Sequence, residues 1–506
     1  MYNVCVEKLQ LSKSVVTFLL FTTACFVFAA EKEGRINSIN SKCGSVLDEQ
    51  GVPIPGASVR IQATEVATTT DLAGRFCLSS DHAELAITAW KEGFYIGGLN
   101  LADVIKSEIT IELRSLPENQ TEYRWLHSHA AATNAASTRS GTEPCGQCHE
   151  RLTNEWLSSS HGQSNKNPLF EHVLSLAERD FSNSGQQCRL CHQPQHETKP
   201  IGCDFCHKIS NVFGIGSQRS GKERIEHLLS EEPPVFFGPL DDVFSRHDSF
   251  NILYTKSEYC AACHQGNFWS TQAYSVYDEW QESRFQREQI QCQDCHMATT
   301  ANFAANKSAG GIRRLSSSLS SHDFLLKGKA DLLSSAIDME VRLNSQNGLL
   351  DVVVELSNNN AGHHVPTGSP LRNMLLLVTA EDKNGELPMS AGSTVPKWAG
   401  NTWQGHAGKG FGKILTEIPN YREEQEQHFE PIYPAPFWRP TIVESDSRIA
   451  AGTTDRSVYS FASGDSESFR VSVRVLYFEY FADWLLSPPP EPVELATYKF
   501  IGEIEP

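Results

Sequence analysis

Outside its first thirty residues the sequence has no apolar run that could cross a membrane. The run at the N-terminus, Val15–Phe28, has fourteen residues, fewer than the roughly 20 that a membrane-spanning helix needs. Two lysines precede it and two alanines follow it, which is the pattern of a cleaved signal peptide. We therefore predict a signal peptide over residues 1–30. We expect an exported chain, in the periplasm or at the cell surface, with no transmembrane helix after cleavage.

Basic residues are also scarce. The chain has 43 Lys and Arg against 61 Asp and Glu, a net charge of -18. Such a surface repels the phosphates of nucleic acids and the anionic headgroups of membranes. We therefore expect neither nucleic acid nor an anionic membrane surface among the partners of this protein.

Beyond Cys77 the chain lacks cysteine except in five short motifs. Of its 14 cysteines, two lie in the signal segment, and Cys43 and Cys77 precede the motifs. The other ten form five Cys-x-x-Cys pairs, and a histidine follows each pair directly. The paired cysteines are Cys145 and Cys148, Cys188 and Cys191, Cys203 and Cys206, Cys260 and Cys263, and Cys292 and Cys295.

Three kinds of site contain Cys-x-x-Cys pairs: zinc sites, thiol redox sites and haem attachment sites. The first two do not require a histidine after every pair. His is 18 of 506 residues, so five chance matches have a probability of roughly one in ten million, and Cys-x-x-Cys-His is the spacing of c-type haem attachment. Two thiols bind the haem covalently and the histidine binds its iron. The sequence therefore predicts five haems c, with the proximal ligands His149, His192, His207, His264 and His296.

The haem-bearing region is expected over residues 117–334. Five porphyrins leave little room there for an ordinary apolar core, so we expect short helices and irregular segments wrapped round the haems. Because His192 and Cys203 are close in sequence, their two haems should be neighbours. A closely packed array of this kind conducts electrons, with potentials set by axial ligands, burial and nearby charge.

Several segments carry a resemblance to a known family. They read EWLSSSHG at 155–162, GPLDDVFSRHDSF at 238–250, YDEWQESRFQREQIQCQDCHM at 277–297 and SSHDF at 320–324. In this order they resemble multihaem cytochromes c related to the tetrahaem cytochrome of ammonia oxidisers. The resemblance covers about residues 143–325 and departs in haem number and in the flanking domains. It implies that His161, His247 and His322 are distal haem ligands.

A further candidate for a distal ligand lies in NNNAGHHVPTGSPLRN, residues 358–373. Its Asn, Gly and Pro residues indicate a tight loop between two apolar runs, and a similar loop recurs in C-terminal domains of related cytochromes. We therefore expect one of its two histidines on a haem, His363 ahead of His364; the alternative is a hairpin loop with two exposed histidines. The remaining candidates are not separable by sequence: His127, His129, His172, His196 and His227, with Met297 a weaker one.

The segment before the haem region, residues 31–116, is predicted to be a small antiparallel β-sandwich, because short alternating runs are separated by Gly/Pro and Asp/Gly turns. It resembles the carboxypeptidase regulatory-like domain, which implies an interaction or adhesion module. Cys43 and Cys77 lie on expected strands, and an oxidising compartment favours a disulfide between them. The alternative is two buried thiols.

The segment after the haem region, residues 335–506, contains five runs of period-two alternation, and residues 497–506 are a candidate last strand. A second β-sandwich is predicted there, with a long irregular insert at about 390–445. The fold class is therefore multidomain: an N-terminal β-sandwich, a central haem-packed domain of mainly helical and irregular structure, and a C-terminal β-sandwich.

Two classes of function are compatible with these features. In the first, the protein carries electrons through bis-His haems to or from a redox partner, such as another cytochrome or a quinol-linked complex. In the second, it is an oxidoreductase acting on a small nitrogen or sulfur compound at one haem with an open distal position. All five motifs end in His and candidate distal histidines are plentiful, so we favour the electron carrier, with the β-domains as contacts to a protein or a surface.

Overall fold

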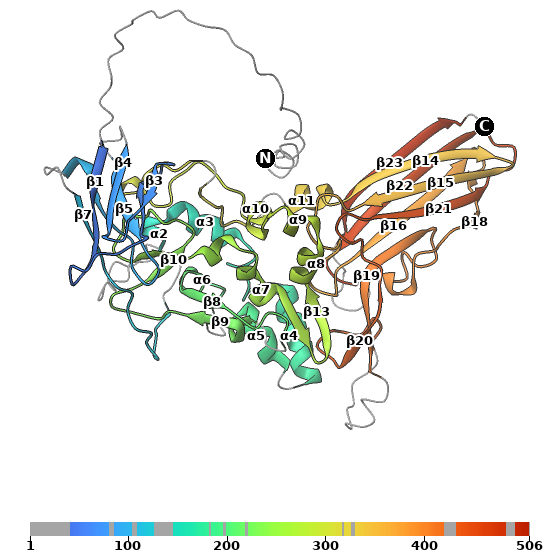
Figure 1. Cartoon of the computed structure of the whole chain (residues 1–506). Helices are drawn as coiled ribbons and strands as arrows, with labels where there is room; N and C mark the ends of the chain where they lie inside the picture. The colour runs from blue at the N-terminus through green and yellow to red at the C-terminus, as the bar shows by residue number, and fades with distance from the viewer. Residues whose placement is uncertain are drawn as a thin grey trace, which may run out of the picture. The chain divides into compact units, whose positions relative to one another are not determined.

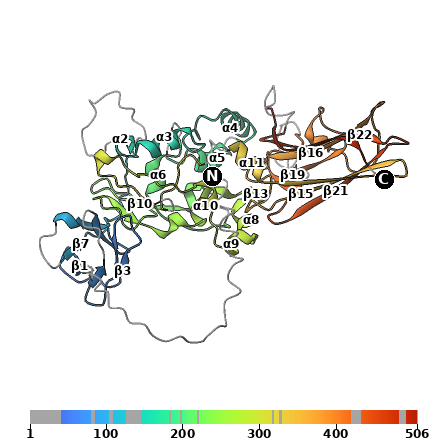
Figure 2. The same ribbon diagram turned by 90° about the horizontal axis from the view of Figure 1, so that it is seen from above.

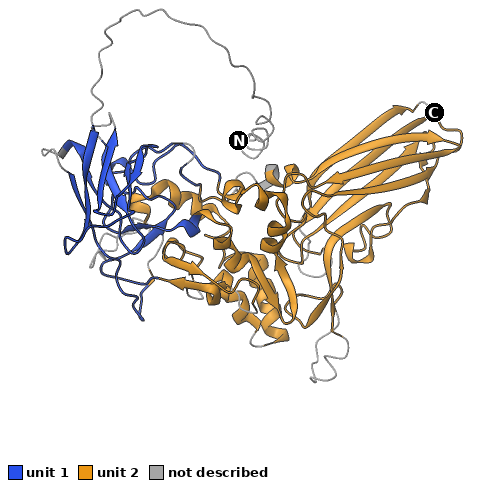
Figure 3. Ribbon diagram, viewed as in Figure 1, with its two compact units in different colours: residues 1–124, 228–254, 298–320 blue, residues 125–227, 255–297, 321–506 orange. Residues whose placement is uncertain are grey.

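The computed structural model describes residues 41–79, 85–103, 109–125, 145–181, 184–195, 199–217, 221–315, 318–324, 329–418, 432–481 and 491–504. The predicted signal peptide lies outside these residues. The chain divides into two compact units (Figure 3). Unit 1 comprises Met1–Arg124, Leu228–Tyr254 and Ala298–Ser320, and unit 2 comprises Trp125–His227, Thr255–Met297 and Ser321–Pro506.

Unit 1 is built round the predicted N-terminal sandwich. One sheet has the order β4-β1-β7 and the other β3-β2-β5-β6. The strands are β1 Ser41–Asp48, β2 Ser58–Ile61, β3 Ala67–Thr69, β4 Arg75–Ser79, β5 Ala86–Trp90, β6 Gly97–Asn100 and β7 Ile109–Leu113. Inward-facing residues of both sheets, among them Val46, Val59 and Ile111, form one apolar core. Alternation along β4 and β7 is strict, as a sheet with one buried face requires.

One detail of the N-terminal expectation is wrong. The sandwich is not fully antiparallel, because β1 pairs with β7 in parallel, Val46 opposite Ile111. Parallel neighbours need a long crossover connection, and the chain between β1 and β7 supplies it by forming the second sheet. The predicted disulfide is confirmed: Cys43 and Cys77 face each other directly on β1 and β4, and a bond joins their sulfurs.

Part of the sequence predicted to belong to the haem region lies instead in unit 1. Residues 228–254 contain β10, Phe236–Gly238, and β11, Asp248–Phe250, which pair in parallel. Val235 and Phe237 pack with Tyr95 in a small apolar cluster, and this burial accounts for the association. Two segments after residue 117, Leu228–Tyr254 and Ala298–Ser320, thus belong to unit 1.

The helical part of unit 2 has short elements, as expected. Its helices are α2 Cys145–Cys148, α3 Glu150–Ser158, α4 Pro168–Asp180, α5 Ser184–His192, α6 Cys203–His207, α7 Glu258–His264, α8 Val276–Glu282, α9 Arg284–Arg287, α10 Cys292–His296 and α11 Lys329–Ser335. Two small sheets lie among them: β8 Ile209–Val212 with β9 Ile225–His227, and β12 Gln265–Phe268 with β13 Thr271–Ser275. The apolar cluster beside α7, α8 and α10 is small, with Tyr277, Trp280 and Phe285 at its centre.

The rest of unit 2 is the C-terminal sandwich, whose long strands are clear in Figures 1 and 2. One sheet has the order β14-β15-β21-β18; the other has the order β20-β19-β16-β22-β23, with β17 beside β16. The strands are β14 Asp338–Gln346, β15 Leu349–Ser357, β16 Asn373–Asp382, β17 Gly385–Glu386, β18 Met389–Ala391, β19 Gly408–Glu417, β20 Thr441–Asp446, β21 Thr454–Ala462, β22 Ser468–Phe478 and β23 Val493–Glu503. The alternate residues Val352 and Val354 of β15 meet Val471 and Val473 of β22 in one core.

The six strands predicted in this region are confirmed, but the insert at 390–445 is not all irregular. It contributes β19 and β20, and β19 lies inside the larger sheet next to β16. The loop at 358–373 is not a hairpin either, because β15 and β16 belong to different sheets. The expected succession of sheets, helices and sheets is present, and none of the helices among the described residues is long and apolar enough to span a membrane.

Candidate haem sites

All five Cys-x-x-Cys-His motifs lie on short helices of unit 2, namely α2, α5, α6, α7 and α10. Residues three apart share one face of a helix, so the two thiols of each motif point to the same side. The ten cysteines form no disulfide with one another, and only Cys188 is fully buried. The donor set of each motif, two thiols outside any disulfide and one adjoining imidazole, fits covalent haem attachment.

The side-chain positions argue against zinc. A structural zinc site uses four Cys or His ligands. In the part of the chain that the structure describes, no three His, Cys, Asp or Glu side chains come together in a way that could hold a metal ion. The motifs therefore lack the ligand set of a zinc site there.

Three of the motif histidines face a second histidine from a distant part of the chain. The ring centroids of His264 and His161 are 6.1 Å apart. Those of His207 and His322 are 6.1 Å apart with an interplanar angle of 19°, and those of His296 and His363 are 6.3 Å apart at 23°.

These separations can be compared with the geometry of a metal between two imidazoles. A metal–imidazole bond is about 2 Å long, so two rings on opposite sides of one ion have centroids roughly 6 Å apart once half of each ring is added. Rings in direct van der Waals contact would be closer. Each of the three pairs therefore has the centroid separation expected of two imidazoles on one iron atom.

The protonation of these rings also suits a metal ligand. Desolvation by the surrounding protein lowers the pKa of His161, His264 and His296 to about 4, so the rings are neutral at pH 7. Desolvation likewise lowers the pKa of His363, whose Nδ1 lies 2.9 Å from the carbonyl oxygen of His364. A hydrogen bond from Nδ1 to a carbonyl leaves Nε2 with its lone pair for the metal and fixes the ring orientation.

Thiols from different motifs lie side by side, and they indicate which motifs are neighbours. A hydrogen bond to the thiol of Cys203 raises the pKa of Cys145. A hydrogen bond to Cys263 raises the pKa of Cys191. These contacts join the motif at 145–149 to that at 203–207, and the motif at 188–192 to that at 260–264.

The motif at 260–264 has a second neighbour of this kind. A hydrogen bond to Cys292 raises the pKa of Cys260, and the charge of Cys206 acts on the same thiol. The motif at 260–264 is therefore in thiol contact with two others. The contact expected between the second and third motifs is not among these thiol pairs and stays a prediction.

The other histidines proposed from sequence lie in several parts of the chain. His247 lies in unit 1, where its ring meets Phe236 at 5.5 Å and its Nε2 is 3.8 Å from Asp248; its role as a ligand stays a prediction. His172 lies on α4. His127, His129 and His196 lie outside the described residues.

Two further features concern the second and third motifs. The ring of Phe170, on α4, stacks on His192 with centroids 4.2 Å apart. His227, at the end of β9, is packed against Phe205 inside the third motif at 4.7 Å. Desolvation lowers the pKa of His227 to about 4, and its role as a ligand stays a prediction.

Two glutamates, the partly buried Glu155 and the buried Glu279, were not identified from sequence. Each accepts a hydrogen bond from the backbone of a segment that bears a candidate distal histidine. The signal that could have found them is a repeat, because Glu-Trp-x-x-Ser occurs at 155–159 and again at 279–283.

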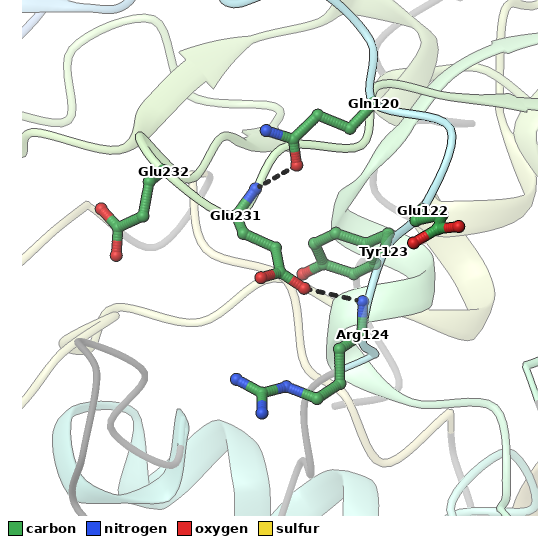
Figure 4. Close-up of a pocket in the computed structure, with 6 residues that line it drawn as sticks. All are labelled: Gln120, Glu122, Tyr123, Arg124, Glu231 and Glu232. Carbon is green, nitrogen blue, oxygen red and sulfur yellow. Dashed lines mark hydrogen bonds between the residues drawn. The ribbon is translucent and has the colours of Figure 1, made fainter.

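Unit 1 has a surface hollow of its own, drawn in Figure 4. Its lining includes three carboxylates and one arginine: Gln120, Glu122, Tyr123, Arg124, Glu231 and Glu232. The backbone N–H of Arg124 donates to Glu231 at 2.9 Å, and that of Glu231 donates to Gln120 at 3.0 Å. No motif residue lines this hollow, so it has no part in the geometry described above.

Comparison with known proteins shows which solved structure has a similar fold. No family model matches the chain, and no curated protein matches it. The fold is similar to that of a solved pentahaem cytochrome. This is the penta-heme cytochrome c552 from Thermochromatium tepidum, with a TM-score of 0.50 and 19% sequence identity over 71% of this chain and 97% of that chain. At this identity the likeness concerns the fold alone.

Proposed function

We propose that this chain is an exported c-type cytochrome with five covalently attached haems, which passes electrons along a closely packed series of bis-His haems to or from a redox partner. The ten motif cysteines would hold the haems. The observation that carries the proposal is the set of three ring pairs, each joining one motif histidine to a histidine far away in sequence at 6.1 to 6.3 Å.

The ring pairs support a specific ligand assignment. His161 would be distal to the motif of His264, and His322 to that of His207. His363 would be distal to the motif of His296. Haem bound at these positions would supply reversible one-electron chemistry at iron. The chain would contribute one imidazole on each side of the metal.

The thiol contacts support a route for the electrons. The first and third motifs are adjacent, and so are the second and fourth and the fourth and fifth. The motif at 260–264 has such a contact to both the second and the fifth motif. We infer that it is a junction in the series.

The surface charge and the disulfide bear on partners and location. The Cys43–Cys77 bond is the kind that persists in oxidising compartments, which supports export to the periplasm or the cell surface. A net charge of -18 favours a redox partner with a basic docking face. The N-terminal sandwich would serve as a contact module.

Two measurements test the proposal. The mass of the mature protein should exceed that of the polypeptide by five haems, and electron paramagnetic resonance of the oxidised protein should show only low-spin bis-His signals. A mass without the five haems refutes covalent attachment. A high-spin signal that changes on adding nitrite, hydroxylamine or sulfite refutes the carrier and supports the oxidoreductase with an open haem.

A further inference from the structure

The sequence Glu-Trp-x-x-Ser occurs twice in unit 2 and forms the same local structure both times. The C-cap residue of helix α3 is Ser159, with φ -81° and ψ 162°, and that of α8 is Ser283, with φ -79° and ψ 165°. In each case the serine Oγ donates to the tryptophan carbonyl three residues earlier at 2.7 Å. The chain therefore leaves both helices in the same direction relative to the Glu-Trp pair.

The two tryptophans make equivalent contacts to haem motifs. Trp156 donates from Nε1 to the carbonyl oxygen of Ile201 at 2.8 Å, and Trp280 donates to that of Ile290 at 2.9 Å. Each of these isoleucines stands two residues before the first cysteine of a motif, Cys203 or Cys292. The indoles are 4% and 7% exposed, so water cannot readily replace either bond.

The two glutamates make equivalent contacts on the opposite side. Glu155 Oε2 accepts the backbone N–H of His322 at 2.9 Å. Glu279 Oε2 accepts the backbone N–H of His364, the residue after His363, at 3.1 Å. A hydrogen bond to a charged carboxylate is stronger than one between neutral groups, so each glutamate is well suited to fix a backbone segment.

The two contacts of each Glu-Trp pair converge on one ring pair. The motif held by Trp156 contains His207, and the segment held by Glu155 contains His322, which faces it. In the second copy, the motif held by Trp280 contains His296, which faces His363. The same pattern, formed from unrelated partner segments, is not expected of two incidental packing contacts.

We propose that the pairs Glu155-Trp156 and Glu279-Trp280 are positioning residues, each of which fixes the backbone on both sides of one haem. The indole fixes the proximal motif and the carboxylate fixes the distal segment. This inference rests on the ligand assignment of the proposed function. Each pair sets the separation of its two imidazoles, and so keeps that haem six-coordinate.

The two copies differ in the residues after the serine. Two positions beyond Ser159 stands His161, which faces His264. The equivalent residue beyond Ser283 is the buried Phe285, which packs closely against Gly362, where an added Cβ would lie 3.3 Å from its ring. The first copy thus bears a candidate ligand of its own, whereas the second packs against the loop of His363.

Both carboxylates also bind an arginine. Arg151 lies one turn before Glu155 on the same helix and forms an ion pair with it. Arg448, from the C-terminal sandwich, pairs with Glu279 at 2.6 Å, and Thr367 Oγ1 donates to the same glutamate at 2.6 Å. The arginine therefore compensates the charge of each glutamate, and the carboxylate also accepts the hydrogen bond from the distal segment.

The test uses carbon monoxide binding to the reduced full-length holoprotein, because this ligand binds only where an axial position opens. His322→Ala and His363→Ala should each bind one carbon monoxide per chain, which first checks the ligand assignment. Glu155→Ala and Glu279→Ala should each bind up to one carbon monoxide per chain. Glu155→Gln and Glu279→Gln keep an acceptor oxygen, so most of their haem should remain six-coordinate. Asn154→Ala and Glu282→Ala, at exposed positions on the same helices, are the matched controls and should bind none.

Double variants make the test specific for each haem. Glu155→Ala combined with His322→Ala should bind one carbon monoxide, no more than His322→Ala alone, because both changes act on one haem. Glu155→Ala combined with His363→Ala should approach two. If Glu279→Ala does not accumulate, Trp280→Phe, which keeps an aromatic ring and removes the indole N–H, carries the same expectation.

Each outcome decides one statement. If the two histidine variants bind no carbon monoxide, the ligand assignment is wrong. If they bind it but the glutamate variants behave like the controls, the positioning role is wrong and the assignment stands. Carbon monoxide binding by Glu155→Ala that adds in full to that of His322→Ala would also overturn the positioning role, since it would show an effect on another haem.

Discussion

A buried ion pair joins the C-terminal sandwich to α4, and its removal should loosen that helix. Arg439 Nε lies 2.7 Å from Asp180 Oδ2, and the two side chains are 1% and 0% exposed. Arg439 also pairs with Glu417 at 2.9 Å. The indole N–H of Trp438 donates to Asp180 at 3.0 Å, so the carboxylate at the end of α4 depends on two neighbouring residues of the sandwich.

The geometry of this pair sets the expected size of the effect of Arg439→Met. Removing one partner of a buried ion pair costs about 3–5 kcal/mol, because the other charge is left uncompensated. Asp180 keeps the bond from Trp438 and an ion pair with the exposed Arg179, so we expect the lower limit, about 3 kcal/mol. This corresponds to a roughly hundredfold larger population of the locally open state.

Hydrogen exchange of the α4 amides measures this directly, and it does not require the whole chain to unfold in one step. Exchange should be roughly a hundredfold faster in Arg439→Met, and part of the protection should return when Asp180→Asn is added. The control is Arg470→Met. Arg470 forms an ion pair with Glu381, and the two side chains are 65% and 41% exposed. Loss of this pair should lower the free energy of unfolding by no more than about 1 kcal/mol. Exchange within threefold of the unmodified protein in Arg439→Met would refute the reasoning.

Three further outcomes are expected. Burial raises the pKa of Asp180, but hydrogen bonds, led by the one from Arg439, outweigh burial and leave the pKa below its ordinary 3.8. The ionised Asp180 therefore stabilises the folded chain fully above about pH 4, and this stabilisation is lost as the pH falls through the folded pKa. Acid unfolding of Asp180→Asn should accordingly depend less steeply on pH. Cys77→Ser opens a loop of 34 residues and should lower the stability of the N-terminal sandwich by about 4 kcal/mol in urea unfolding. His363→Ala should give one high-spin haem by electron paramagnetic resonance and His364→Ala none, because only the His363 ring faces a motif histidine; the reverse result would exchange their roles.

The sequence predicted strands best where one face of a strand is buried. In β15 the alternation of buried and half-exposed residues is regular, and the period-two pattern is plain in the sequence. β19 was missed because both of its faces are covered along residues 411–415, and a strand buried on both faces does not alternate. Its glycines at 408, 410 and 412 made it look like a loop, although they allow close packing in the middle of the sheet.

The haem motifs and the ring pairs differ in how far they can be predicted. Covalent attachment fixes the spacing of thiols and histidine within five residues, so local sequence contains all of that information. The partner of each motif histidine depends on the fold: His322 and His207 are brought together by segments more than a hundred residues apart. Family resemblance suggested the distal candidates, but only the three-dimensional arrangement indicates which motif each one faces.

The C-terminal sandwich is better understood as part of the haem-binding unit than as an appended module. It supplies His363, which faces a motif histidine. It also supplies Arg439 and Arg448, which pair with Asp180 and Glu279 on the helices between the motifs. Losing either arginine while its carboxylate stays buried would cost about 3–5 kcal/mol, a large part of the stability of an ordinary domain. Residues of α4 also share an apolar cluster with Phe437 and Trp438, so we expect the sandwich and the haem region to fold together.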